Sequence, residues 1–207
     1  MKDGLRFCVL SLVFIPWFSW VVASGTESKS NPKRALLIID IQEFYFPGGS
    51  SELVKPDEAS LNARKLLEHF RKTDQLVIHV KHKASTGSNI HEHVLPIAGE
   101  RVIEKTQINS FKNSPLHQFL QENKIEALVI CGMQTHMCVE AATRAACDLG
   151  YVCTLIQDAC ATKDLEYQGE IVAADDVHLS TLATLNLYLQ IAQKGRITDT
   201  KEYLSGE

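Results

Sequence analysis

Three residues of this 207-residue chain could together supply a catalytic base, a cation and a nucleophile. Asp40, Lys105 and Cys138 each end or closely follow a short apolar run. A carboxylate serves as a general base, a lysine stabilises an anion, and a thiolate attacks carbonyl carbon. Residue types at these positions therefore predict nucleophilic catalysis by Cys138, with Asp40 as the base and Lys105 as the cation.

Each of these residues also has a structural interpretation. An Asp after a strand often forms a turn, a Lys usually lies on the surface, and a free Cys is often a small buried side chain. Cys138 directly precedes a predicted helix, residues 139–149. Because a helix N-terminus favours an anion, we expect the pKa of Cys138 to be lowered there. Three strand-end positions with complementary chemistry favour the catalytic interpretation.

The elements that must position these residues alternate between strand and helix. Short apolar, β-branched runs are typical of strands covered on both faces. They lie at residues 35–39, 76–80, 101–105, 127–131 and 151–156. Helical patterns lie at residues 59–70, 139–149 and 177–191. The first helix has a predicted buried stripe of Leu61, Leu66, Leu67 and Phe70. The last has one of Leu179, Leu182, Leu185 and Leu189. This alternation predicts an α/β three-layer sandwich with a mostly parallel, doubly wound, Rossmann-like sheet, whose ligands bind beyond the carboxyl ends of the strands.

The N-terminus has the composition of a secretory signal peptide. A net-positive opening precedes an uncharged apolar run over residues 7–23, and a polar stretch follows. The run is shorter than the roughly 20 residues that a spanning helix needs, although an uncleaved anchor stays open as an alternative. We expect cleavage near Ala23 and a secreted or periplasmic protein. The expected segments are a signal peptide (residues 1–23), a flexible segment (24–33) and one folded domain (34–207).

Composition and charge restrict the partners. Hydrophobic residues make up 45% of the chain, charged residues 22%, and the net charge is -4, as in ordinary soluble domains. The sequence has no cluster of basic residues and no nucleotide-binding glycine motif. We therefore expect a small-molecule substrate, no nucleic acid, no stable membrane association after cleavage and no cofactor.

Four further cysteines are expected to be structural thiols, although export to an oxidising compartment leaves open whether two of them form a disulfide. They are Cys131, Cys147, Cys153 and Cys160.

Three stretches resemble the isochorismatase-like cysteine hydrolases, a family that includes nicotinamidases and N-carbamoyl amide hydrolases. They read ALLIIDIQ (35–42) with FPGG (46–49), VIEK (102–105) with SF (110–111), and VICGMQTHMCV (129–139). The similarity continues through residues 150–152 and 158–162 and covers about residues 34–190. It identifies the folded domain as an isochorismatase-like hydrolase domain.

The resemblance implies a role for each matching residue. Asp40 matches the general base, Lys105 the catalytic lysine and Cys138 the nucleophile of an Asp-Lys-Cys triad. It also implies a cis peptide between Met133 and Gln134, and an oxyanion site formed by the backbone N–H groups of Gln134 and Cys138. The cysteine favours hydrolysis of a carbon–nitrogen bond (amide, urea or carbamoyl type) through a thioester. Two alternatives stay open: an isochorismatase-type vinyl-ether hydrolase, and a non-catalytic secreted binding protein on this scaffold.

The sequence departs from the family at two places. Where the family commonly reads Asp-x-Gln-Asn-Asp-Phe, residues 40–45 of this chain read Asp-Ile-Gln-Glu-Phe-Tyr. The Asp-x-His motif of metal-binding nicotinamidases is absent. We therefore expect no metal site and interpret His91 and His93 as surface histidines on a loop, and a metal site at these two residues stays open as the alternative.

Four side chains are candidates for substrate binding: Phe44, Tyr45, Phe111 and His136. Aromatic side chains near strand ends are as often part of the core. Members of the family often form dimers or larger assemblies, so a homo-oligomer is expected as one option. The apolar helix over residues 177–191 either serves such an interface or packs on the sheet.

Overall fold

The five predicted strands and one that was not predicted, over residues 195–198, form a six-stranded parallel sheet. The computed structural model describes residues 32–206, so the predicted signal peptide and most of the predicted flexible segment lie outside the described residues. The strands are β1 (Arg34–Ile39), β2 (Leu76–His82), β3 (Arg101–Lys105), β4 (Ala127–Met133), β5 (Val152–Ala161) and β8 (Gly195–Thr198). Their order is β3-β2-β1-β4-β5-β8, and every neighbouring pair is parallel. The predicted doubly wound sheet is confirmed.

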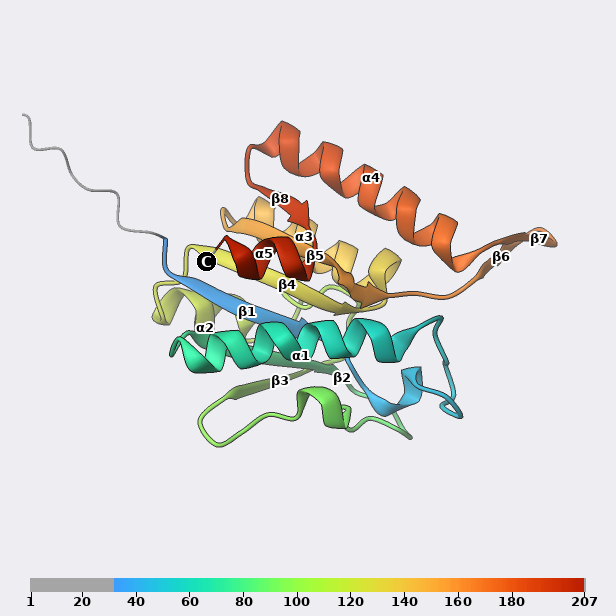
Figure 1. Ribbon diagram of the computed structural model, residues 1–207, viewed down its shortest axis with the longest axis horizontal. Coiled ribbons are helices and arrows are strands. Elements are labelled where there is room, and N and C mark those ends of the chain that lie inside the picture. The colour runs from blue at the N-terminus through green and yellow to red at the C-terminus, as the bar shows by residue number, and fades with distance from the viewer. Residues whose placement is uncertain (1–31, 207) are drawn as a thin grey trace, which may run out of the picture. The chain divides into compact units, whose positions relative to one another are not determined.

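Helices cover both faces of the sheet, as Figure 1 shows. One buried cluster includes residues of α1 (Pro56–Lys72) and α5 (Thr200–Ser205), and the other includes residues of α2 (Leu116–Glu122), α3 (Glu140–Asp148) and α4 (Ala174–Ala192). A two-stranded antiparallel hairpin, β6 (Leu165–Tyr167) and β7 (Glu170–Val172), lies between β5 and α4. The arrangement confirms the three-layer sandwich. Among the described residues, no helix has the length and apolar character needed to cross a bilayer.

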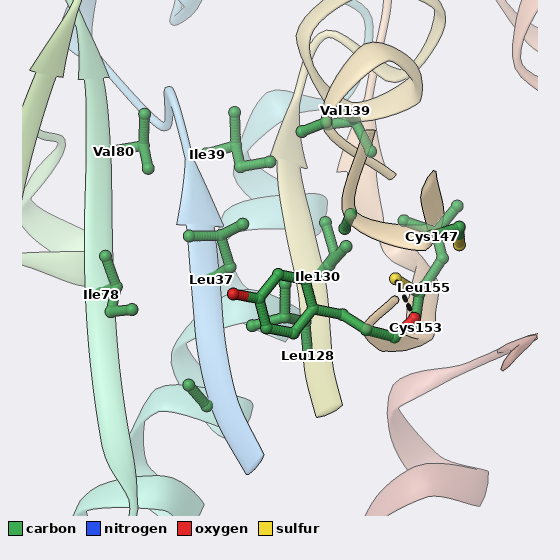
Figure 2. Close-up of a cluster of buried hydrophobic side chains, with 14 of the residues drawn as sticks. Leu37, Ile39, Ile78, Val80, Leu128, Ile130, Val139, Cys147, Cys153 and Leu155 are labelled. Atoms are coloured by element: carbon green, nitrogen blue, oxygen red, sulfur yellow. Dashed lines mark hydrogen bonds between the residues drawn. The ribbon is translucent and has the colours of Figure 1, made fainter. Parts of the chain in front are cut away.

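Residues of β1 alternate between the two faces of the sheet. Leu37 and Ile39 belong to the cluster that includes α3, whereas Leu36 and Ile38 belong to the cluster that includes α1. Figure 2 shows Leu37 and Ile39 beside Ile130 of β4. Because both faces are covered from Ala35 to Ile39, this part of the strand has no polar position, which explains its wholly apolar sequence after Arg34. Each fully buried Leu or Ile contributes about 1.5–3 kcal/mol to folding.

Two leucines that the sequence analysis places in buried stripes are exposed. Leu61 of α1 is 43% exposed and Leu179 of α4 is 66% exposed. Leu61 lies on the opposite side of α1 from the buried Phe70, and Leu179 lies about 100° around α4 from the buried face. Both helices carry apolar residues on more than one side, so spacing alone did not separate the buried side from the exposed one.

A buried charge network joins α1, β2 and the loop before β3. Arg71 donates to Glu100 through Nε at 2.7 Å and Nη2 at 2.8 Å, and His79 Nε2 lies 2.9 Å from Glu100 Oε2. The Ile97 N–H also donates to this carboxylate, at 3.0 Å. Burial acts to raise the pKa of Glu100, but hydrogen bonds from Arg71, Ile97 and His79 outweigh it and lower the pKa to about 2.

Replacing Glu100 by Gln should make the fold less stable in a pH-dependent way. The pKa of Glu100 is lower in the folded chain than its ordinary value of 4.5, so its stabilising contribution is present above pH 4.5 and is lost as the pH falls toward 2. At pH 7 we expect Glu100→Gln to cost about 3 kcal/mol in free energy of unfolding, and clearly less at pH 3. Urea unfolding at both pH values measures the difference.

Glu104→Gln is the matched control, because Glu104 pairs with Lys81 at 3.3 Å on a half-exposed site. Such a surface pair contributes about 0–1 kcal/mol. An equal loss for Glu100→Gln at pH 7 and pH 3 would contradict the assignment.

Candidate active site

Asp40, Lys105 and Cys138 meet at one edge of the sheet. Asp40 directly follows β1, Lys105 ends β3, and Cys138 lies in the turn after β4. Lys105 Nζ lies 2.7 Å from Asp40 Oδ2 and 3.3 Å from Cys138 Sγ. The three residues are 0%, 2% and 6% exposed, respectively. The structure therefore places the base, cation and nucleophile expected from the sequence in one buried group.

The backbone at Asp40 turns sharply out of β1. Asp40 adopts a left-handed conformation with φ of 51°, and its N–H donates to the Val80 carbonyl of β2 at 2.9 Å. Asp is among the few residue types that adopt this conformation at moderate cost. On the other side, β4 approaches closely at Gly132, where an added Cβ would overlap the Ile39 carbonyl oxygen. Glycine at that position lets the turn after β4 lie close to Asp40.

The Lys105 ammonium has more acceptors around it than hydrogens to donate. Besides Asp40 and Cys138, the Gln107 carbonyl lies 3.1 Å from Nζ and His82 Nδ1 lies 3.4 Å from it. An ammonium carries three N–H donors, so these four partners share them. Lys105 therefore connects the carboxylate, the thiol and His82.

The turn that carries Cys138 is wider than expected. A cis peptide joins Met133, the last residue of β4, to Gln134. A π-helical turn, η3 (Thr135–Val139), follows and contains Cys138, and α3 begins at Glu140. The sequence analysis predicts Cys138 immediately before a regular helix, whereas Cys138 lies inside this turn.

Two histidines hold the η3 turn to neighbouring elements. Thr135 Oγ1 lies 2.9 Å from Nδ1 of His178 on α4, and His136 Nδ1 lies 2.6 Å from Oγ1 of Thr162, which follows β5. His136, a candidate for substrate binding from the sequence, is thus engaged in positioning the turn. The sequence alone gave neither His178 nor Thr162 a role at the site, because their partners lie far along the chain.

Of the predicted aromatic lining residues, Tyr45 lies by the reactive group. Burial and the charges of Asp40 and Cys138 raise the pKa of its hydroxyl, and the side chain of Gln134 acts in the opposite direction. Phe44 is buried and packs edge to face on Tyr45, with ring centroids 4.2 Å apart. Phe111 stacks instead on Tyr151, whose ring belongs to the cluster beside α3. Phe111 therefore packs against the hydrophobic core, which is the alternative that the sequence left open for it.

Burial controls the electrostatics of the site. It raises the pKa of Asp40, and Lys105 acts in the opposite direction. Burial first and the charge of Asp40 second raise the pKa of Cys138 to about 12, again against Lys105. The predicted lowering of the Cys138 pKa is therefore wrong while Asp40 is ionised, because burial and a neighbouring negative charge outweigh the helix N-terminus. The thiol keeps its proton at neutral pH in that state.

The other cysteines are buried and do not form disulfides in the described part of the chain. Cys131, Cys147, Cys153 and Cys160 are at most 7% exposed. Their placement within strands and α3 agrees with a role as small apolar side chains.

One set of side chains has the composition of a metal site. Asp57, His91 and His93 each offer a ligand atom, and these atoms lie within 4.8 Å of one another. His91 was expected on the surface but is 8% exposed and stacks on Phe46 at 3.5 Å. Two imidazoles and a carboxylate are ligands of the kind that zinc binds. This set lies on α1 and the loop after β2, and does not include the residues around Cys138.

A cavity of about 210 Å³ lies beside the turn rather than over the three reactive side chains. Its lining includes Thr162 and His178, which hold η3, together with residues at the beginnings of α1 and α4. Asp40, Lys105 and Cys138 do not line it.

Comparisons with known proteins agree on one family. A family model of the isochorismatase domain matches residues 34–178. An uncharacterized isochorismatase family protein of Bacillus subtilis is 45% identical over 73% of this chain and 91% of its own length. A streptothricin hydrolase of Streptomyces noursei is 30% identical over 70% of this chain, which spans only 60% of that relative. A crystal structure of a protein from Oleispira antarctica is 38% identical, with a TM-score of 0.79 over 85% of this chain and 98% of that one.

Replacing Asp40 by Asn should make Cys138 easier to alkylate. The variant removes the negative charge that raises the pKa of Cys138, so more thiolate is present at a given pH. Each unit of lowered pKa gives about ten times more thiolate. We expect iodoacetamide to modify Cys138 at least about tenfold faster at pH 8 in Asp40→Asn than in the wild type. Peptide mass mapping follows each of the five thiols of the described residues.

Glu68→Gln, a change of an exposed carboxylate on α1, is the control and should leave the rate unchanged. A Cys138 rate in Asp40→Asn equal to or below that of the wild type, in a variant that is folded by circular dichroism, would refute the electrostatic coupling.

Proposed function

Because this chain belongs to the isochorismatase family of hydrolases, we propose that it is a cysteine-dependent hydrolase that cleaves a carbon–nitrogen bond of a small molecule. The observation that carries the proposal is the buried contact of one ammonium, Lys105, with both Asp40 and Cys138. Amides, ureas and carbamoyl compounds are the proposed substrate class. A streptothricin hydrolase among the relatives supports hydrolysis as the general chemistry.

The first half of the proposed reaction forms a thioester. Asp40 takes the proton of the Cys138 thiol, and Lys105 then stabilises the thiolate in place of the carboxylate. The thiolate attacks the substrate carbonyl carbon, and the backbone N–H groups of Gln134 and Cys138 donate to the developing oxyanion. Asp40 returns the proton to the nitrogen as the carbon–nitrogen bond breaks. An amine or ammonia leaves, and the acyl group stays on sulfur.

Water completes the cycle. Asp40 is again ionised and accepts a proton from a water molecule that attacks the thioester carbon. The carbon–sulfur bond breaks, an acid is released, and the proton returns to the thiol of Cys138. Overall, one amide and one water give one acid and one amine.

Tyr45 and the η3 turn support this role. The side chain of Gln134, the residue whose N–H is proposed to hold the oxyanion, lies near enough to Tyr45 to lower the pKa of its hydroxyl. Thr135 and His136, the next two residues, are fixed by His178 and Thr162. The backbone of an oxyanion site must keep its position during the reaction, and these side-chain contacts restrict its motion.

Replacing Cys138 by Ala should abolish turnover and leave the fold intact. Ammonia or amine release from a panel of small amides, ureas and carbamoyl compounds measures the activity. We expect at least a thousandfold loss, since removing the nucleophile of such a group costs roughly a millionfold in other hydrolases. Rapid quenching of the wild type should also trap an acyl group on the Cys138 peptide, detected by its mass.

Cys147→Ala is the matched control, because Cys147 is equally buried and free. Retained turnover in pure, folded Cys138→Ala would overturn the thiol mechanism. Turnover of a vinyl ether by that variant would favour the isochorismatase-type alternative.

A further inference from the structure

The end of β2 lies beneath the buried ion pair. The order β3-β2-β1 separates Lys105, at the end of β3, from Asp40, directly after β1. Lys105 nevertheless reaches Asp40 at 2.7 Å, so the pair crosses the strand between them. His82 is the last residue of β2 and the register partner of Lys105. The topology of the sheet therefore places His82 beside the pair.

His82 directs its side chain to the face on which Cys138 lies. Val80 and Ile103, two residues before His82 and Lys105, belong to the same buried cluster as Cys138. Side chains alternate along a strand, so His82 and Lys105 share this face. His82 Nδ1 lies 3.4 Å from Lys105 Nζ, which in turn lies 3.3 Å from Cys138 Sγ. The imidazole is therefore within reach of a substrate bound to the thiol.

The backbone of His82 is held by a fully buried amide. Gln42 Oε1 accepts from the His82 N–H at 2.7 Å, and Gln42 Nε2 donates to the His82 carbonyl at 3.0 Å. The same Nε2 donates to the Ser88 carbonyl at 2.8 Å. Gln42 is 0% exposed, so its amide is dedicated to these backbone groups. These two hydrogen bonds fix the backbone position from which the His82 side chain extends.

His82 is the accessible member of this group. Asp40, Lys105 and Cys138 are buried, whereas His82 is half-buried. An ammonium only donates hydrogen bonds, so in the neutral imidazole the Nδ1 that faces Lys105 is the nitrogen without a proton. The proton is then on Nε2, the other ring nitrogen, and is free to be offered to a ligand.

We propose that His82 determines substrate specificity by donating its Nε2–H to an oxygen acceptor on the atom next to the attacked carbon. The inference rests on the proposed function and deepens it. It narrows the substrates to compounds that carry a carbonyl or carboxylate oxygen beside the carbonyl that Cys138 attacks.

Two alkylating reagents test the inference without a known substrate. Iodoacetate and iodoacetamide both place a CH₂ carbon before the thiolate of Cys138, and iodide leaves from it as the carbon–sulfur bond forms. The neighbouring carbon bears a carboxylate in the first reagent and an amide in the second. A carboxylate accepts the stronger hydrogen bond. The measured quantity is the ratio of the two rate constants for Cys138 at one pH, where the thiolate fraction is common to both.

His82→Phe keeps an aromatic ring and removes the donor, and we expect it to lower the iodoacetate-to-iodoacetamide ratio about tenfold. His82→Gln keeps an N–H at a similar distance from the backbone and should retain most of the ratio. His82→Ala removes the donor without adding bulk, and we expect it to lower the ratio as His82→Phe does. It replaces His82→Phe as the test if the larger ring impairs folding.

His117→Phe is the matched control. Its half-buried ring lies on α2 and contacts the Tyr151 hydroxyl at 3.0 Å, not Lys105, so the ratio should equal that of the wild type. Thermal unfolding and near-UV circular dichroism establish that each variant is folded.

An unchanged ratio in folded His82→Phe and His82→Ala would overturn the inference. A loss in His82→Gln as large as in His82→Phe would overturn the donor role. Neither result bears on the thiol mechanism, which fails separately if Cys138→Ala retains turnover.

Discussion

A single buried ammonium between two acids governs the chemistry of this protein. Lys105 contacts both the carboxylate of Asp40 and the thiol of Cys138. Burial opposes two negative charges at once, so the site holds one, either on the carboxylate or on the sulfur. Moving a proton from the thiol to the carboxylate moves that charge without bringing in a new one. The raised pKa of Cys138 therefore agrees with the proposed mechanism, in which the thiol is activated by proton transfer to its neighbour rather than being permanently ionised.

The buried group of Asp40, Lys105 and Cys138 adds little to folding stability, so the fold must be stabilised by interactions outside this site. A buried ion pair contributes little net stability, because desolvation offsets the attraction. The left-handed backbone at Asp40 adds a further local cost. The two apolar clusters on the faces of the sheet, and the carboxylate of Glu100 with its three hydrogen-bonding partners, supply the stability. The reactive side chains can therefore be placed for chemistry rather than for packing.

Recognition of the substrate falls to residues around this group. The three reactive side chains are common to the proposed chemistry, and membership in a hydrolase family does not specify what is hydrolysed. In the proposed mechanism, Tyr45, His82 and the η3 turn have a different role, because they would present groups toward the substrate or hold the oxyanion site. Their substitution is then expected to change selectivity while the ammonium, the carboxylate and the thiol remain.

The sequence alone predicted five of the six strands of the parallel sheet, and it selected Asp40, Lys105 and Cys138 as candidate reactive residues, because these features depend on local patterns. The covered strand over residues 35–39 is wholly apolar, and each candidate residue ends or follows a predicted strand. The sequence did not predict the pKa of Cys138, because burial and the charge of Asp40 arise only when β1 and β4 lie side by side. It assigned no role at the site to His82 or His178, whose partners Lys105 and Thr135 are distant in the chain, and it did not predict the exposure of Leu179, which depends on how α4 is rotated. Local composition determined which elements form and which residues end them. Tertiary structure decided which groups meet, and how burial changes their charge, because electrostatic and hydrogen-bond energies depend on distance in space rather than separation in sequence.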